Sequence, residues 1–576
     1  MRLFPALSVP GPLQVTGRQA SSSAWMHDVA AIAFLALLAR FLYFSQASRI
    51  GMSQDGFLLT YLMQTGDLQA FYAPQVAGRP FLGLGWRLAG LLMGGTATGY
   101  NAFTAATLLF SAIFIYCLMR TLAPRQPVWA LLAAAFKIVW MANYEVFDTS
   151  GLDIYFAEAL FWLALWALAV ALSRQEAPAW PQVLVSPAIV MACVAVLVGS
   201  YQTPWPVVLM GPLALFAVQT TPPRRGYASL MVGAWYLAAL PMMLWCYLLS
   251  RQFVSHNGVP IGELLRRVPK GIWDSTAKTL YFPFDPRKGY AHAGFTLPVV
   301  LFTVGLAVLL VWSGLRSWPA FRELPPKRLL HNLMIAAIVA VCVVVVEVLP
   351  PSLLYEPSYG NRTVHFSSLG TLVGIVAGLA WLCYRYRVAG CAIGGVAAIV
   401  LIFHMAQEAQ DVGNHYGVNG YMNRRFWEDV STEISRVDEG TVVLLDTPAK
   451  GIATADWLST QLLREFTETH LSFFVADGHP VYDPVRKTYQ VTSAMDLEQV
   501  DPVLMPGRNS RFPKMLAKPR TFEVPADRVV WAEWNFDTLR LKVLPERSAL
   551  QHLHTNIPSL YGQVLFPRAA SAVTAP

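Results

Sequence analysis

Long apolar runs, separated by short polar segments, recur along the first two thirds of the chain. Each run has roughly 17–22 residues, the length at which a helix crosses a bilayer. The pattern therefore predicts about eleven membrane spans. They lie near residues 29–47, 101–121, 127–143, 154–172, 184–200, 204–220, 228–249, 296–314, 331–349, 367–383 and 387–405. The run 81–95 is shorter and contains Trp86 and Arg87, so we interpret it as a helix lying in the membrane interface.

The segment 406–576 is predicted to form a separate small domain. It opens with a polar stretch at 407–411, and helical periodicity follows at 426–434 and 455–466. Apolar runs at 441–446 and 471–475 are typical of buried strands, and the alternation of apolar and basic residues at 539–543 is typical of a half-buried strand. We therefore expect a soluble α/β or α+β domain with its own core.

The composition excludes a soluble globular chain. Of the 576 residues, 55% are hydrophobic and only 14% are charged. We expect no signal peptide, because residues 1–24 are polar and no small-residue cleavage site follows the first apolar run.

All six cysteines fall in or beside predicted spans, so we expect neither disulfides nor a cysteine zinc site in the polar loops or the C-terminal domain.

Charges in the short loops predict the orientation of the chain. Basic residues gather in alternate loops, at Arg120, Arg125, Arg174, Arg224, Arg225, Arg316, Arg322, Lys327, Arg328, Arg385 and Arg387. The loop 144–153 carries acids and no Lys or Arg. The positive-inside rule then places the extension 1–28 in the cytoplasm. The transmembrane domain is 29–405, and its loops 48–100, 144–153, 250–295 and 350–366 lie outside together with the domain 406–576.

The outer loop 250–295 departs from this rule because it is rich in Lys and Arg. One interpretation is an amphipathic interfacial helix at 261–270, whose basic face contacts anionic headgroups. The other is a cationic rim for a phosphate-bearing lipid. The two interpretations are compatible.

Charged residues inside the spans indicate where chemistry takes place, because they are costly there. Arg40, Lys137, Glu158 and Glu347 all fall in the outer half of their spans. Snorkelling to the outer interface accounts for Lys137 and Arg40. A carboxylate cannot extend as far, so we expect Glu158 and Glu347 to face protein or a wet cavity. A transporter would more often carry charge near the midplane on broken helices, so this asymmetry favours chemistry at the outer face.

The strongest candidate for a catalytic base is Asp55, just after the first span. The chain contains no P-loop, no His-Glu-x-x-His helix and no Gly-x-Ser-x-Gly elbow. A substrate that is already activated and delivered by the membrane fits these observations. A carboxylate in a partly dry site can accept a proton from a hydroxyl, and Arg79, Arg362 and Lys288 are candidates to hold a departing phosphate.

Simpler interpretations of these residues stay open. Asp55 could cap a helix that begins at Gly56. Arg79 and Arg362 could anchor their segments to headgroups, and His365 is interpreted as a polar residue of the interface rather than a ligand. Asp148 and Asp153, with Glu158 and His365, are candidates to surround the reacting groups or the acceptor.

These features resemble the integral-membrane GT-C glycosyltransferases, which use polyprenyl-phosphate-linked sugars. The resemblance covers 29–405: an acid after the first span, interfacial helices, about eleven spans and an outer C-terminal domain. It implies that Asp55 is the first-loop catalytic acid, and that Arg362, within 359–366, takes the place of the arginine in the family's late motif. Gln54 stands where many members carry a second acid, which favours a metal-free base.

We therefore predict an inverting glycosyltransferase of the cell envelope, in the inner (plasma) membrane with its C-terminal domain extracytoplasmic. Its partners would be a polyprenyl-phosphate-linked sugar, membrane lipid and a glycan, lipid or protein acceptor, without nucleic acid. No cofactor is required, although the acids of loop 144–153 are compatible with a divalent cation. A transporter or lipid flippase with an outward-facing polar cavity, and a non-enzymatic membrane scaffold, are the alternatives.

Overall fold

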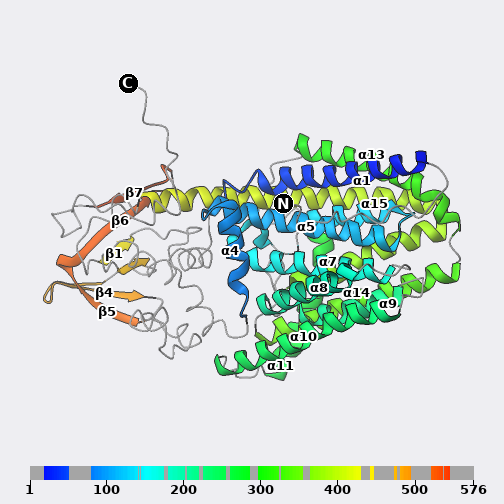
Figure 1. Cartoon of the computed structure of the whole chain (residues 1–576). Coiled ribbons are helices and arrows are strands. Elements are labelled where there is room, and N and C mark those ends of the chain that lie inside the picture. The colour runs from blue at the N-terminus through cyan, green and yellow to red at the C-terminus, as the bar shows by residue number, and fades with distance from the viewer. Residues whose placement is uncertain are drawn as a thin grey trace.

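The computed structural model describes residues 18–50, 79–140, 142, 144–173, 180–201, 204–218, 225–253, 260–285, 296–323, 326–354, 364–429, 442–445, 472–475, 481–493, 520–535 and 537–544. Within these ranges the protein is a long helical bundle with a strand-rich region at one end (Figure 1). We call this end of the bundle the domain end.

The bundle is built from long helices joined by short helical turns. In chain order these elements are α1 (Arg18–Ala39), η1 (Arg40–Phe44), α4 (Leu82–Met93), α5 (Ala97–Leu122), α6 (Pro127–Val139), η2 (Tyr144–Phe147), η3 (Thr149–Gly151), α7 (Leu152–Ser173), α8 (Trp180–Ser200), α9 (Trp205–Val218), α10 (Arg225–Phe253), α11 (Ile261–Trp273), η4 (Asp274–Lys278), α12 (Thr279–Tyr281), η5 (Phe282–Phe284), α13 (Leu297–Glu323), α14 (Pro326–Leu354) and α15 (His365–Asp429).

Eight helices among the described residues are long and apolar enough to cross a membrane. Each of the eight coincides with a predicted span. Helix α15 contains two predicted spans, 367–383 and 387–405, because it folds back at Arg387, whose φ of 48° interrupts the helix. Two further predicted spans, 127–143 and 204–220, correspond to the shorter apolar helices α6 and α9. The protein is therefore a polytopic helical membrane protein, as the apolar runs predicted.

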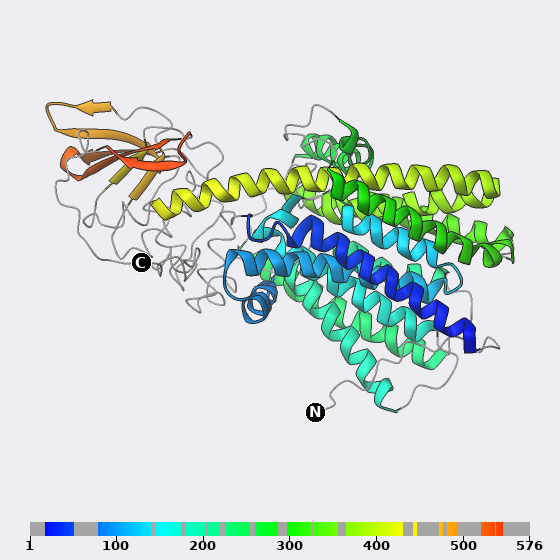
Figure 2. The same cartoon turned by 90° about the horizontal axis from the view of Figure 1, so that it is seen from above.

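Helix α4 has a different direction from its neighbours. It runs across the domain end of the bundle, whereas α5, α7 and α15 run along it (Figures 1 and 2). It begins against the end of α8, where the Phe81 amide donates to the Gly199 carbonyl at 3.0 Å and the Ser200 hydroxyl donates to the Phe81 carbonyl at 3.1 Å. The approach is so close that a Cβ at Gly199 would lie 2.5 Å from the Phe81 ring. The crosswise direction is the one expected of an interfacial helix.

A polar contact joins three helices at the opposite end of the bundle. The Arg120 guanidinium donates to both carboxylate oxygens of Asp28, at 2.9 and 3.2 Å, and the Tyr116 hydroxyl donates to Asp28 at 2.6 Å. His27 bonds to the Ser313 hydroxyl at 2.6 Å, which adds α13 to the contact between α1 and α5. Helix α1 begins at Arg18. The extension 1–28, which we expected to precede the membrane part, therefore contains the first turns of this helix.

Two sheets form the described C-terminal strands. The first has the order β2-β1-β6-β7 and combines β1 (Val442–Leu445), β2 (Ser472–Val475), β6 (Val529–Asn535) and β7 (Arg540–Val543). Its first two pairings, β1 with β2 and with β6, are parallel, and β7 is antiparallel to β6. The second sheet is antiparallel with the order β3-β4-β5 and contains β3 (Val481–Asp483), β4 (Thr488–Ser493) and β5 (Arg520–Pro525), followed by the turn η10 (Ala526–Arg528). The strands predicted near 441–446, 471–475 and 539–543 are confirmed.

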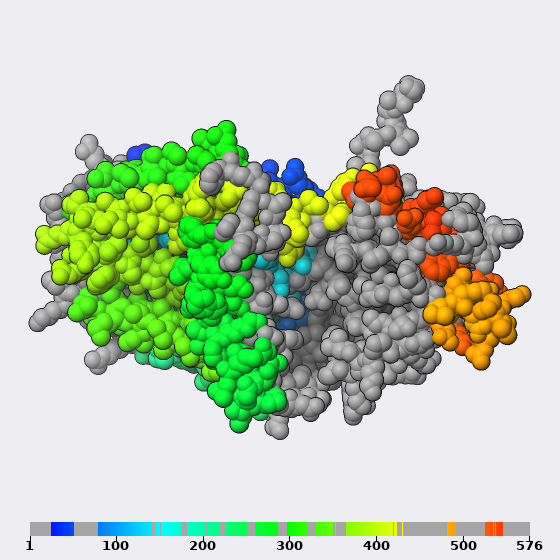
Figure 3. Space-filling model, turned by 180° about the vertical axis from the view of Figure 1, so that it is seen from behind, coloured from blue at the N-terminus to red at the C-terminus, as the bar shows by residue number. Residues whose placement is uncertain are grey.

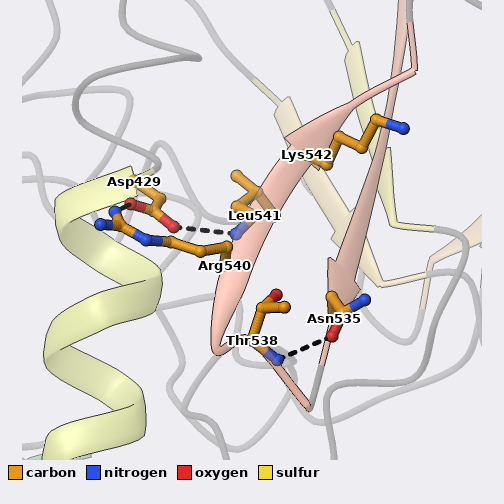
Figure 4. A pocket seen from close by; sticks show the side chains of 6 residues that line it. All are labelled: Asp429, Asn535, Thr538, Arg540, Leu541 and Lys542. Carbon is orange, nitrogen blue, oxygen red and sulfur yellow. Dashed lines mark hydrogen bonds and ion pairs between the residues drawn. The ribbon is translucent and has the colours of Figure 1, made fainter.

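The second half of α15 connects the bundle to these strands. It continues through the polar stretch 407–411, which we had expected to open the C-terminal domain, as far as Asp429 (Figure 2). There the Asp429 carboxylate accepts from Arg540 Nη1 at 2.7 Å and from the Leu541 amide at 2.8 Å (Figure 4). A cavity of about 490 Å³ beside this contact is lined by Asp429, Asn535, Thr538, Arg540, Leu541 and Lys542. We call the Asp429–Arg540–Leu541 contact the strut clamp.

Candidate functional site

The carboxylate of Glu158 is the centre of a buried polar network between α6, α7 and the start of α15. Lys137 Nζ lies 2.7 Å from Glu158 Oε2, and His365 Nε2 lies 2.9 Å from the same oxygen. Trp162 Nε1 donates to Glu158 Oε1 at 2.9 Å. Lys137, Glu158 and His365 are almost completely buried. Since a carboxylate only accepts, the His365 ring donates its Nε2–H, and the charges of Lys137 and Glu158 balance each other.

The network joins three helices that are far apart in sequence. Lys137 lies in the last turn of α6, Glu158 in the second turn of α7 and His365 at the first position of α15. A second contact ties α6 to α15, because Trp140 Nε1 donates to the Ser368 hydroxyl at 2.9 Å. The start of α15 is therefore fixed against α6 and α7 by hydrogen bonds between side chains.

Arg79 lies beside this network on the surface of an aromatic ring. Its guanidinium carbon is 4.9 Å from the centre of the Tyr201 ring, a cation–π geometry. Tyr201 packs in turn against Phe366, with ring centres 6.2 Å apart, and Phe366 follows His365 in the chain. Arg79 is thus connected through two aromatic rings to the start of α15. A guanidinium over a ring face keeps N–H groups that can donate hydrogen bonds.

A second buried polar group lies farther along α15. The Tyr144 hydroxyl donates to Glu408 Oε1 at 2.9 Å, and Gln407 Nε2 donates to Asp411 Oδ1 at 3.0 Å. Glu408 and Asp411 are fully buried. The polar stretch 407–411 is therefore an internal polar face of a long helix, packed against η2.

The acids of loop 144–153 lie in or next to the short turns η2 and η3 and at the start of α7. Asp153, at the start of α7, is buried, and Asp148 is half-buried. The loop closes tightly, with the Asp148 amide bonded to the Glu145 carbonyl at 3.0 Å and the Gly151 amide to the Asp148 carbonyl at 3.0 Å. Among the described residues, no group of three or more His, Cys, Asp or Glu side chains is placed to hold a metal ion.

Three of the predicted site residues lie outside the described residues: Asp55, Lys288 and Arg362. Of the others, Glu158 and His365 are brought into direct contact, and Arg79 is connected to them through Tyr201 and Phe366. No hydrogen bond joins Asp148 or Asp153 to the Glu158 carboxylate, whose described donors are Lys137, Trp162 and His365.

Two predictions about single residues were wrong. Lys137 does not snorkel to the interface: it is 1% exposed, because the Glu158 carboxylate balances its charge inside the bundle. His365 is likewise buried and bonded to Glu158 instead of lying in the interface. Arg40 is exposed. The expectation that Glu158 and Glu347 face protein is confirmed, since both are fully buried and Glu347 Oε1 accepts from the Val207 amide at 2.6 Å.

Sequence reasoning missed the residues that connect the site. Tyr201, Trp140 and Trp162 were unremarkable aromatic residues in an aromatic-rich chain. Glu408 was assigned to the polar opening of the C-terminal domain. The one available signal was its position, since a carboxylate 21 residues after Arg387 falls near the same membrane depth as Glu158 if the helix continues.

Comparisons with known proteins found similarity to solved structures alone. No protein-family model and no curated protein matches the chain. Among solved structures, ArnT from Cupriavidus metallidurans bound to undecaprenyl phosphate is similar over 77% of this chain and 85% of its own, with 14% identity and a TM-score of 0.35. The apo structure of the same ArnT is similar over 75% and 84%, with 15% identity and a TM-score of 0.34. TM-scores below 0.5 do not establish a shared fold, so an activity has to be inferred from the residues themselves.

Proposed function

We propose that this protein is an inverting membrane glycosyltransferase, which moves a sugar from a polyprenyl-phosphate donor to an acceptor hydroxyl at the outer face of the membrane. Asp55 is the proposed general base. Arg79, Arg362 and Lys288 are the proposed cations that hold the donor phosphate. The domain end of the bundle is the proposed outer face, because the loop charges place the C-terminal domain outside.

The proposal is carried by the positions of the described residues that flank two segments, the one that contains Asp55 and the one that contains Arg362. The segment that contains Asp55 begins after Ile50, whose carbonyl accepts from Asn101 Nδ2 at 3.2 Å, and it ends at Arg79 on the Tyr201 ring. The segment that contains Arg362 ends at the start of α15, which Tyr201 contacts through Phe366. Arg79 therefore stands where both segments rejoin the bundle.

Chain length supports bringing these groups together. Asp55 is five residues from Ile50, so it can be at most about 18 Å away, and Arg362 is three residues from His365, at most about 11 Å. The second limit keeps Arg362 near the start of α15, which Phe366 and Tyr201 connect to Arg79, and the first keeps Asp55 near the end of the first span. The buried Lys137–Glu158–His365 network provides a fixed base for it, since each of these side chains is held by a partner on another helix.

The proposed reaction is a single displacement. The acceptor oxygen forms a bond to the anomeric carbon while the bond from that carbon to the phosphate oxygen breaks. The acceptor proton moves to the Asp55 carboxylate, and the electron pair leaves on the polyprenyl phosphate. The charge that develops on the phosphate is stabilised by guanidinium groups, which bind phosphate oxygens in a bidentate way. Attack opposite the leaving group inverts the anomeric centre.

The remaining predicted site residues have supporting roles in this proposal. Glu158 and His365 act as positioning residues, because they contact each other and the start of α15, from which Arg362 is three residues away. Asp148 and Asp153 are proposed to lie on the acceptor side, next to α7. The reaction as written needs no cofactor, and a divalent cation near the loop acids would be an addition to it.

The decisive test replaces Asp55 with Asn and measures transfer from a polyprenyl-phospho-sugar in membranes. Loss of a general base reduces a rate by about 10²–10⁴-fold. The matched control is Asp67→Asn, which makes the same change in the same segment and should retain activity. Equal activity of the two variants, at equal expression, would refute Asp55 as the base.

The same preparation separates the alternatives. A transporter or flippase would move a labelled lipid or solute across a vesicle membrane without changing it covalently, and a scaffold would do neither. A product that contains the donor sugar and requires Asp55 is expected only from the enzyme.

A further inference from the structure

The segment from α11 to η5 leaves an apolar stripe uncovered. It crosses the bundle instead of running along it, as the green band in Figure 3 shows. Ile261, Leu265, Pro269 and Trp273 are spaced four residues apart, so they lie along one side of α11. All four are exposed, and the exposed fractions of Ile261, Leu265 and Trp273 are 78%, 71% and 54%. A stripe of this kind is unfavourable in water.

The opposite side of the segment is fixed to the bundle. The Arg267 guanidinium donates to the Ser352 carbonyl at the end of α14, at 3.4 Å. Ser275 shares a hydrogen bond of 2.5 Å with Ser367, and the Thr371 hydroxyl donates to the Ser275 carbonyl at 2.7 Å. Because these contacts hold the inner side, the apolar stripe has a fixed direction, away from the bundle.

The helix that carries the stripe packs against a long apolar helix whose own surface is partly exposed. Val345 and Leu349, on the long apolar helix α14 against which α11 packs, are exposed as well. Aromatic rings follow at the end of α11, where Trp273 and Tyr281 are both exposed and their ring centres are 6.2 Å apart. Trp and Tyr are enriched at the boundary between hydrocarbon and headgroups.

The charges of the segment are predominantly positive. From Ile261 to Lys278 it has four basic residues, Arg266, Arg267, Lys270 and Lys278, and two acids, Glu263 and Asp274. Hydrogen bonds from Arg266 and Arg267 lower the pKa of Glu263 to about 2, so these ion pairs persist at neutral pH. The net charge next to the apolar stripe is therefore positive, which favours anionic headgroups.

We propose that α11 is a lipid-docking helix, with Ile261, Leu265 and Trp273 inserted among the acyl chains and Arg266 and Lys270 on anionic headgroups. The occupant of the stripe is the surface of an anionic bilayer. This inference does not depend on the transfer reaction proposed above.

The test measures the depth of single spin labels in the full-length protein, with the six native cysteines replaced by Ala, reconstituted in phosphatidylcholine vesicles with phosphatidylglycerol. Leu265→Cys is the test position. Leu349→Cys on α14 is the lipid-facing reference, and Val485→Cys in the turn between β3 and β4, 90% exposed, is the aqueous reference. The ratio of collisions with oxygen to collisions with a water-soluble nickel complex should be several-fold higher at 265 than at 485, and close to that at 349.

Two outcomes would overturn the docking. A ratio at 265 equal to that at 485 would show that the stripe faces water. Protection of 265 from both oxygen and nickel would show that protein covers it, for example a second copy of the chain.

The requirement for anionic headgroups is tested by comparing vesicles with and without phosphatidylglycerol. With phosphatidylglycerol omitted, the label at 265 should move toward water, and the double substitution Arg266→Glu and Lys270→Glu should abolish the difference between the two lipid compositions. If the depth at 265 is the same in both compositions before this substitution, the anionic part of the proposal is refuted.

Discussion

Lys137 and Glu158 form an ion pair of 2.7 Å between α6 and α7, with both side chains removed from solvent. The pair joins the last turn of α6 to the second turn of α7. Neither charge would be tolerated alone in an apolar bundle, since an unpaired buried charge is strongly destabilising. Together they form a neutral unit to which His365 adds a hydrogen bond.

Removing one partner of this pair should destabilise the protein. We expect Lys137→Met or Glu158→Gln to lower the free energy of unfolding by about 3–5 kcal/mol, because the remaining group is left buried without its partner. The double variant should recover part of this loss. Thermal unfolding of the protein in detergent measures the effect. As a control, Glu523→Gln breaks the exposed pair with Arg486 and should change the stability by less than about 1 kcal/mol.

The hydrogen bond from His365 should hold the start of α15 in the position that transfer requires. We expect His365→Leu to lower kcat about tenfold, since the start of α15 loses its link to Glu158 and about 1–3 kcal/mol of unsatisfied polar interaction results. His365→Gln can still donate to the carboxylate and should restore most of the activity. A separate determination of kcat and KM checks this. Equal loss in both variants would contradict a positioning role through the hydrogen bond.

Arg79 should contribute to binding of the donor phosphate. We expect Arg79→Met to raise the KM for a polyprenyl-phospho-sugar about 10- to 100-fold, the effect of losing a charged hydrogen bond worth about 1.5–3 kcal/mol. Arg87→Met is the matched control, because Arg87 is an exposed arginine on the neighbouring helix α4. An unchanged KM for Arg79→Met would exclude Arg79 from the donor site.

The Tyr201 ring should control the position of Arg79. Tyr201→Phe keeps an aromatic face under the guanidinium and should leave the donor KM unchanged within about twofold, since the cation–π contact of about 0.5–2 kcal/mol is retained. Tyr201→Leu removes the face, so the KM should rise in the direction seen for Arg79→Met. Donor titrations of the two variants, side by side, provide the test. A larger effect of Phe than of Leu would point to the hydroxyl instead.

The strut clamp should hold the C-terminal strands to α15. Asp429→Ala leaves the Leu541 amide and Arg540 without their acceptor, which should weaken the junction by about 1–3 kcal/mol. Limited proteolysis and amide hydrogen exchange should show earlier opening of β7, while the bundle keeps its protection. Asp527→Ala, in an exposed turn, is the control. Unchanged exchange at β7 would show that the clamp is dispensable.

The elements of the fold were largely predictable, because their signals are local. The lengths of the apolar runs predicted the long helices, and the short run at 81–95 predicted a helix of different direction, which α4 confirms. Alternation at 539–543 predicted β7, with Leu541 buried between the exposed Arg540 and Lys542. The polar stretch 407–411 was misleading, since polar residues usually mark the end of a span, but here Glu408 accepts a hydrogen bond from Tyr144 inside the bundle.

The candidate site was also predictable only in part. The sequence by itself determined that charges gather in one half of the spans, because each charged residue can be counted along its own apolar run. Only the tertiary structure decided that Lys137, Glu158 and His365 form one network, and that Arg79 reaches it through Tyr201 and Phe366. The bonded partners Glu158 and His365 are 207 positions apart along the chain. Helix packing brings them together, and no local periodicity encodes which helices become neighbours.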